Sequence, residues 1–169
     1  DLLNFLARSD GSLWIPGQKG LYAYDNGRLE PLGEEIIADH QVIDLLEDPT
    51  GRVWLTTSDG KLLCYEGGSF RLIQKMAVPS SRGGLCMDKM GRLWIGTFWM
   101  GLYCYDTTRF EVFQEARGLP SNRVHCLAED AKGLLCIGTQ EGLASYDGVT
   151  FRPSERIRTL ANMGVSAML

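Results

Sequence analysis

One short segment of this sequence carries side chains suited to binding a ligand. Phe98, Trp99 and Met100 are consecutive and apolar, and an exposed tryptophan can stack on a sugar ring or on a peptide. The same three residues could instead pack on a neighbouring part of the protein or on a partner domain, and the sequence leaves both interpretations open. The corresponding positions elsewhere in the chain are polar pairs: Gln18-Lys19, Ser58-Asp59 and Gln140-Glu141.

The histidines and cysteines do not form a catalytic or metal-binding pattern. His40 and His125 are the only histidines, and they lie in separate parts of the chain without convergent carboxylates. The five cysteines are odd in number, and none belongs to a CxxC motif or another close metal spacing. We therefore expect no catalytic residue, no metal and no cofactor, and we interpret the thiols as core-filling side chains. They are Cys64, Cys86, Cys104, Cys126 and Cys136.

Composition narrows the class of protein. The 169 residues are 44% hydrophobic and 22% charged, which is typical of a globular domain. A net charge of −4 gives no basic surface for nucleic acid. No apolar run approaches the ~20 residues that a membrane helix needs, so we expect no direct membrane insertion.

The segment around Trp99 is one copy of a repeat that organises the chain. Its copies begin at Gly11, Gly51, Gly91 and Gly133, which lie 40, 40 and 42 residues apart. The four units span about residues 2–41, 42–81, 82–123 and 124–164, and residues 165–169 align with the first residues of each unit. We therefore expect one segment over residues 1–169, with a partial fifth unit at its end, that continues in a longer array.

Each unit is expected to form four short strands. In the third unit these are a strand from about Arg82 to Met87, the strands 93–97 and 102–105, and a strand that begins at Phe110. Aspartates such as Asp48 precede the glycines in the type I turns between the first two strands. Strands that are apolar on both faces must be covered on both faces, and the radial arrangement that achieves this is a β-propeller. We expect an all-β fold with four four-stranded antiparallel blades and the first strand of a fifth, arranged as an arc of a larger ring. The sequence leaves open two other arrangements, in which the four blades close into a small ring or two copies of the chain complete an eight-bladed ring.

Residues that recur in register are interpreted as core, and residues that depart from the repeat as candidates for function. The tryptophans at 14, 54 and 94 and the tyrosines at 24, 65, 105 and 146 are therefore expected to pack between blades. The loop with Trp99 and the linkers that precede each first strand should share one rim. Arg82 and Arg123 lie in those linkers and could donate hydrogen bonds there, although a solvated role suits each of them taken alone.

The repeat resembles a known family. The pattern V-x-x-L-x-E-D-x-x-G-x-L-W-I-G-T, then G-L-x-x-Y-D and G-L-P-S-N-x-V, is similar to the two-component regulator propeller repeat, most clearly over 91–106 and 118–133. The resemblance implies the extracytoplasmic, periplasmic sensor region of a bacterial histidine kinase, often a hybrid one, in which the signal is in several cases a carbohydrate. Pro16-Gly17, Thr56-Thr57, Cys136 and Gly83-Gly84 depart from the pattern.

We therefore expect a non-catalytic propeller segment that senses a small molecule or a glycan through Phe98, Trp99, Met100, Arg82 and Arg123. Its other partners would be further blades or a second copy of the chain. Two alternatives remain: a purely structural or protein-interaction propeller, and a propeller lyase, a class whose histidine-centred site has no counterpart here.

Overall fold

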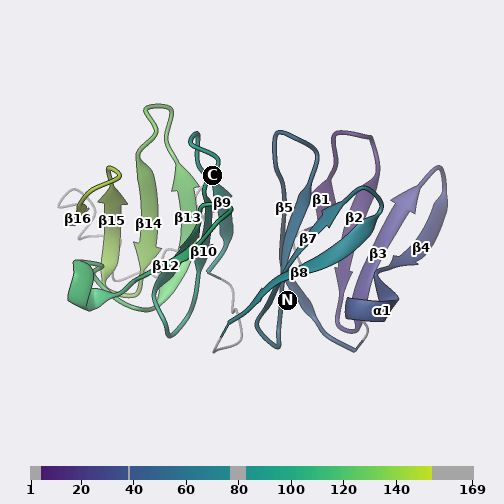
Figure 1. Cartoon of the computed structure of the whole chain (residues 1–169), viewed down its shortest axis with the longest axis horizontal. Coiled ribbons are helices and arrows are strands. Elements are labelled where there is room, and N and C mark those ends of the chain that lie inside the picture. Colours follow the sequence, from purple (N-terminus) through teal and green to yellow (C-terminus); the bar gives the residue numbers. More distant parts are fainter. Residues whose placement is uncertain (1–4, 38, 77–82, 154–169) are drawn as a thin grey trace. The chain divides into compact units, whose positions relative to one another are not determined.

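The computed structural model describes residues 5–37, 39–76 and 83–153, and it divides into two compact units, Asp1–Ser80 and Ser81–Leu169. The expected strand at 165–169 and Arg82 lie outside the described residues. The first unit contains two four-stranded antiparallel sheets (Figure 1). One is formed by β1 (Leu6–Ala7), β2 (Leu13–Gly17), β3 (Gly20–Asp25) and β4 (Arg28–Leu32), and the other by β5 (Val42–Glu47), β6 (Val53–Thr57), β7 (Lys61–Glu66) and β8 (Ser69–Lys75).

The second unit repeats this arrangement. Its first sheet contains β9 (Leu85–Met87), β10 (Leu93–Gly96), β11 (Leu102–Tyr105) and β12 (Phe110–Phe113). Its second sheet contains β13 (Val124–Glu129), β14 (Leu135–Thr139), β15 (Gly142–Tyr146) and β16 (Phe151–Pro153). The four four-stranded antiparallel sheets predicted from the repeat are confirmed.

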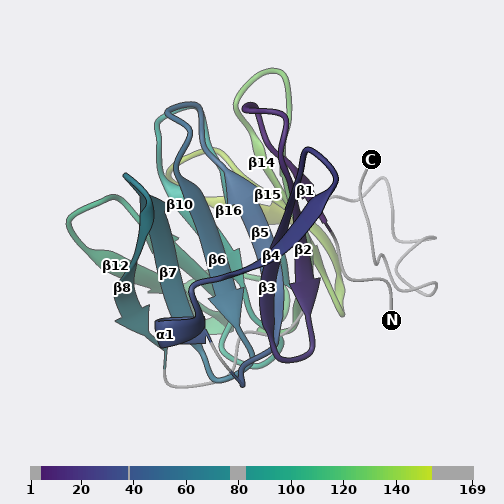
Figure 2. The same ribbon diagram turned by 90° about the vertical axis from the view of Figure 1, so that its right-hand side faces the viewer.

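Two short helices in the linkers were not predicted. Helix α1 (Glu34–Ile37) connects β4 to β5, as Figure 2 shows, and the 3-10 helix η1 (Glu115–Arg117) follows β12. Both are single turns of chain, too short to have a periodic pattern in the sequence. Ile37 is nevertheless fully buried in the core of the first unit.

In the second, third and fourth units a phenylalanine follows the tyrosine of the third strand by five residues, and this fixed interval has a simple geometric cause. The two residues are cross-strand partners on the third and fourth strands of a sheet, so a hairpin of constant length sets their spacing. Their rings are close in each case: 4.9 Å apart for Tyr65 and Phe70, 4.6 Å for Tyr105 and Phe110, and 4.5 Å for Tyr146 and Phe151.

Trp14 and Trp94 fill the space between the two sheets of their units, as predicted. Trp14 lies edge-on to Tyr65 of the next sheet at 4.9 Å, and Trp94 lies edge-on to Tyr146 at 5.5 Å. Trp14 and Trp94 are almost fully buried, and so is Trp54. Where the fourth sheet has Cys136 in place of tryptophan, the thiol is only partly covered.

Turn aspartates hold the tryptophan-bearing strands in place. Asp48 accepts hydrogen bonds from the Thr50 backbone N–H (2.8 Å), from Arg52 Nε (2.7 Å) and from Trp54 Nε1 (2.9 Å). Asp88 repeats the arrangement with Arg92 Nε (2.6 Å) and Trp94 Nε1 (2.8 Å). The turn prediction is confirmed, but the sequence did not indicate the contact with the indole.

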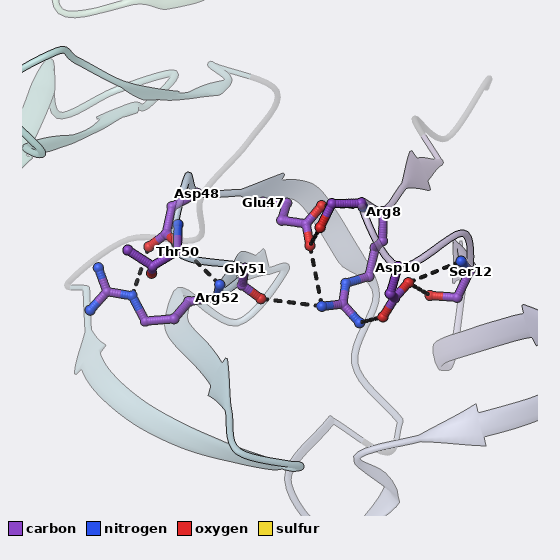
Figure 3. A network of polar contacts seen from close by, with 9 residues as sticks. Arg8, Asp10, Ser12, Glu47, Asp48, Thr50, Gly51 and Arg52 are labelled. Atoms are coloured by element: carbon purple, nitrogen blue, oxygen red, sulfur yellow. Dashed lines mark hydrogen bonds and ion pairs between the residues drawn. The ribbon is translucent and has the colours of Figure 1, made fainter.

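In each unit, the first strand of the second sheet ends in a glutamate that links the two sheets. Glu47 accepts hydrogen bonds from the backbone and the hydroxyl of Ser9 (2.7 and 2.9 Å), and Figure 3 shows Arg8 between the same carboxylate and Asp10. In the second unit Glu129 accepts from the Lys89 backbone N–H at 2.9 Å. Each link joins the first strand of one blade to the turn of the blade before it.

The glycine pair in the third unit has a steric cause. A Cβ added at Gly83 would lie 2.2 Å from the carbonyl carbon and oxygen of Gly96, and one added at Gly96 would lie 2.2 Å from the Gly83 oxygen. No side chain fits at this approach. The strand predicted from about Arg82 is β9, which has three residues and begins only at Leu85.

Candidate functional site

The loop with Trp99 is held firmly at its base. The Thr97 hydroxyl donates to the Gly101 carbonyl (2.8 Å) and accepts from the Met100 backbone N–H (3.0 Å), and Thr97 itself is fully buried. Gly101 has a φ of +80°, and a Cβ there would lie 2.2 Å from the Phe113 carbonyl oxygen. The loop therefore leaves and re-enters the sheet at fixed points, while 57% of Trp99 is exposed.

Five side chains gather at this end of the second unit, and we call them the Trp99 rim: Phe98, Trp99, Arg123, His125 and Gln140. The Arg123 guanidinium lies 4.4 Å from the centre of the Trp99 ring and 5.7 Å from that of Phe98. Phe98 is perpendicular to Trp99 at 5.0 Å and edge-on to His125 at 5.6 Å. The Gln140 side-chain oxygen accepts a hydrogen bond from Arg123 Nη1.

The linker before β13 fixes Arg123 from the other side. The Glu115 carboxylate accepts from the Asn122 backbone N–H (2.8 Å), and the Asn122 side chain accepts from the Glu115 backbone N–H (3.0 Å). Arg123 donates its own N–H to the Ser121 hydroxyl (3.2 Å) and accepts at its carbonyl from the Gln140 N–H (3.0 Å). The guanidinium thus extends from a backbone that is hydrogen-bonded on both sides.

The structure brings three of the five predicted site residues together. Phe98, Trp99 and Arg123 contact one another, whereas Met100 lies half-buried beside them, with its carbonyl 3.4 Å from the Gln114 amide nitrogen. The fifth, Arg82, lies outside the described residues.

Sequence reasoning missed His125 and Gln140 as rim residues. Gln140 belongs to the polar pair of another loop, and the sequence raises His125 only as a catalytic or metal-binding group. A signal was present, because strand pairing places the loop after β14 beside the start of β13.

The corresponding end of the first unit has the same scaffold and a different surface. The Thr57 hydroxyl donates to Asp59 (2.6 Å), which also lies 3.5 Å from Lys61 Nζ and 3.6 Å from His40 Nδ1. No aromatic residue belongs to this described cluster. Its charges are mutually compensated, so the Trp99 rim is the better candidate for binding.

The described residues offer little for metal or nucleophilic chemistry. No group of three or more His, Cys, Asp or Glu side chains in these ranges could hold a metal ion. Burial raises the pKa of the Cys86 thiol to about 11 and that of Cys104 to about 12, so both are protonated at neutral pH. Burial likewise raises the pKa of Cys64, Cys126 and Cys136.

A cavity of about 200 Å³ lies at the other end of the second unit, lined by residues including Arg92, Cys104, Asp106, Arg109 and Tyr146. Its charged groups are paired: Arg109 Nε lies 3.2 Å from Asp106, and Arg92 is bound to Asp88. These pairs belong to the turns that shape the sheets, so the cavity has no obvious charge to offer a ligand.

No protein-family model matches the sequence, and no curated protein matches it. Solved structures do resemble the chain. The extracellular domain of the putative hybrid two component system BT3049 from B. thetaiotaomicron superposes with a TM-score of 0.76 at 20% identity, over 94% of this chain and 23% of that domain. The corresponding domain of BT4673 from the same organism gives 0.73 at 22% identity, over 89% and 21%.

The four sheets are β-propeller blades. The fold predicted from the repeat is thereby confirmed. The same blades also superpose on virginiamycin B lyase from Staphylococcus aureus, with a TM-score of 0.70 at 13% identity, over 91% of this chain and 56% of the lyase. The propeller spans less than a quarter of the length of the two extracellular domains. None of the described helices is long and apolar enough to cross a membrane.

Proposed function

We propose that this propeller segment is the ligand-sensing part of a bacterial two-component regulator outside the cytoplasm, and that it binds a sugar-containing small molecule at the Trp99 rim without catalysis. One observation carries the proposal: Trp99 is largely exposed although its loop is fixed at both ends. A rigid exposed aromatic ring loses little conformational entropy on binding. The repeat pattern and the likeness to extracellular domains of hybrid two-component systems support the sensing role.

A ligand on this rim would contact two blades at once. Phe98 and Trp99 belong to the loop between β10 and β11, whereas Arg123 and His125 precede or begin β13. The two blades are joined there by hydrogen bonds from Val124 N to the Thr97 carbonyl (2.9 Å) and from Gly101 N to the Asn122 carbonyl (2.9 Å). Binding that favours one spacing of these blades would shift their equilibrium, and further parts of the protein would respond.

The test compares two truncations of exposed apolar side chains in the second unit. The wild type, Trp99→Ala and Met90→Ala are screened against a glycan and metabolite panel, and the best hit is titrated by calorimetry. We expect Trp99→Ala to weaken binding at least tenfold, because stacking on the ring is lost. Met90, 77% exposed in the turn between β9 and β10, is the control and should bind as the wild type does.

Two alternatives make different predictions. If the rim contacts only other domains, Trp99→Ala will change the oligomeric state and no ligand will be found. The likeness to virginiamycin B lyase favours an enzyme as the second alternative. In that case, turnover of the panel hit will be detected, and His125→Ala will abolish it. Binding without turnover would favour the sensor.

A further inference from the structure

Arg123 differs from most other arginines of the described residues in its partner. Six of them lie within ion-pair distance of a carboxylate, at 2.5 to 3.2 Å, whereas no described carboxylate lies within that distance of Arg123. An uncharged amide, Gln140, and two aromatic rings hold it instead. The six are Arg8, Arg52, Arg92, Arg109, Arg117 and Arg152.

The guanidinium is also preorganised. Stacking on Trp99 and the hydrogen bond to Gln140 restrict a side chain that normally has high rotamer entropy, and Arg123 is half-buried. A guanidinium has five N–H donors, and Gln140 accepts at one nitrogen. A positioned cation with donors to spare and no neutralising carboxylate is suited to a charge supplied by a ligand.

We propose that the Trp99 rim recognises an acidic oligosaccharide. One sugar ring stacks on the exposed face of Trp99, and the carboxylate of a uronate residue accepts two hydrogen bonds from Arg123. The inference rests on the proposed function and narrows its ligand class. The carboxylate takes the place that an aspartate or glutamate occupies beside the other six arginines.

The experiment uses matched ligands in which the carboxylate is either free or converted to an uncharged methyl ester. Uronate oligosaccharides are each titrated beside their methyl esters into the wild type, Arg123→Gln, Arg123→Lys and Arg109→Gln. We expect the wild type to bind an acid at least tenfold more tightly than its ester. Arg123→Gln should reduce that ratio to about one while the ester still binds, and Arg123→Lys should retain part of it. Arg109, whose side chain is 76% exposed and paired with Asp106, is the control and should leave the ratio unchanged.

Salt and folding give two further readouts. The preference for the acid should decline as sodium chloride increases, because the added attraction is ionic. The thermal melt of Arg123→Gln should match that of the wild type, so that loss of preference reports on the site.

The inference and the proposed function fail in different ways. Equal binding of acid and ester by the wild type, or a ratio that survives Arg123→Gln, overturns the acidic ligand class while leaving a sugar-binding rim intact. If no saccharide of either kind binds, both the inference and the proposed function are rejected. If only neutral glycans bind and Trp99→Ala abolishes their binding, the rim binds sugars but does not select for an acidic one, and the inference is wrong.

Discussion

Replacing Asp48 by asparagine tests how the blades are held together. The carboxylate is 4% exposed and accepts hydrogen bonds from Thr50, Arg52 and Trp54. Burial by itself would raise the pKa of Asp48, but the hydrogen bonds from Thr50, Trp54 and Arg52 outweigh it and lower the pKa from 3.8 to about 2. A shift of that size corresponds to about 2 kcal/mol of stability at neutral pH.

Asparagine keeps the shape but loses one acceptor. Its NH₂ group must face either the backbone N–H donors or the side-chain donors of Arg52 and Trp54, and one unsatisfied buried donor costs about 1–3 kcal/mol. We therefore expect Asp48→Asn to lower the unfolding free energy at pH 7 by roughly 2–4 kcal/mol. Urea unfolding followed by tryptophan fluorescence measures this, and the exposed Asp25→Asn is the control, with an expected change below about 0.5 kcal/mol.

The pH dependence sharpens the test. Because the pKa of Asp48 is lower in the folded state, its contribution is fully present above the unfolded value of 3.8 and is lost as the pH falls toward 2. The difference in unfolding free energy between the wild type and Asp48→Asn should thus stay constant from pH 7 to about 5 and become smaller as the pH falls to 3. If Asp48→Asn is as stable as the wild type at pH 7, or if the difference in unfolding free energy does not become smaller in acid, the reasoning is refuted.

Two other predictions follow from packing. Gly83→Ala should destabilise the second unit by about 1–3 kcal/mol or more, because its methyl group would overlap the Gly96 backbone; a urea midpoint equal to that of the wild type would contradict this. Tyr24 and Leu29 are 46% and 58% exposed at the positions where other blades receive a tryptophan, so we expect the isolated chain to self-associate. Leu29→Ser should reduce that association in sedimentation velocity, whereas a wild-type chain that is monomeric at all concentrations would argue against an uncovered blade face.

Most of the fold could be predicted from the sequence because the same strand and turn patterns recur in the four repeats. Turn aspartates, lead glycines and the tyrosine–phenylalanine interval each reflect one hairpin geometry, and the structure shows them in register. The misses have local causes. Helix α1 is only four residues long, and the close approach of Gly83, just before β9, to Gly96 at the end of β10 is a contact that no single-strand pattern contains.

The candidate site was only partly predictable. Phe98 and Trp99 were found because they interrupt a polar pattern, and Arg123 because its linker shares the rim. Gln140 and His125 were missed because their part in the rim depends on which side chains meet across two blades. The proposed ligand charge depends on the observation that no described carboxylate lies within ion-pair distance of Arg123, and this is a fact about three-dimensional neighbours. A sequence containing Glu115, Glu129 and Glu141 near that position could not have excluded an ion pair.

The way the loops are anchored makes the binding experiments interpretable. Thr57, Thr97 and Thr139 are each less than 5% exposed, and each hydroxyl closes the loop that follows it, at Asp59, Gly101 and Gly142. The residues beyond these anchors differ in every blade, so the sheets do not depend on them. An exposed side chain such as Trp99 can then be removed at a cost of about 0.5 kcal/mol or less. A loss of affinity in Trp99→Ala would therefore reflect the missing ring rather than an unfolded blade.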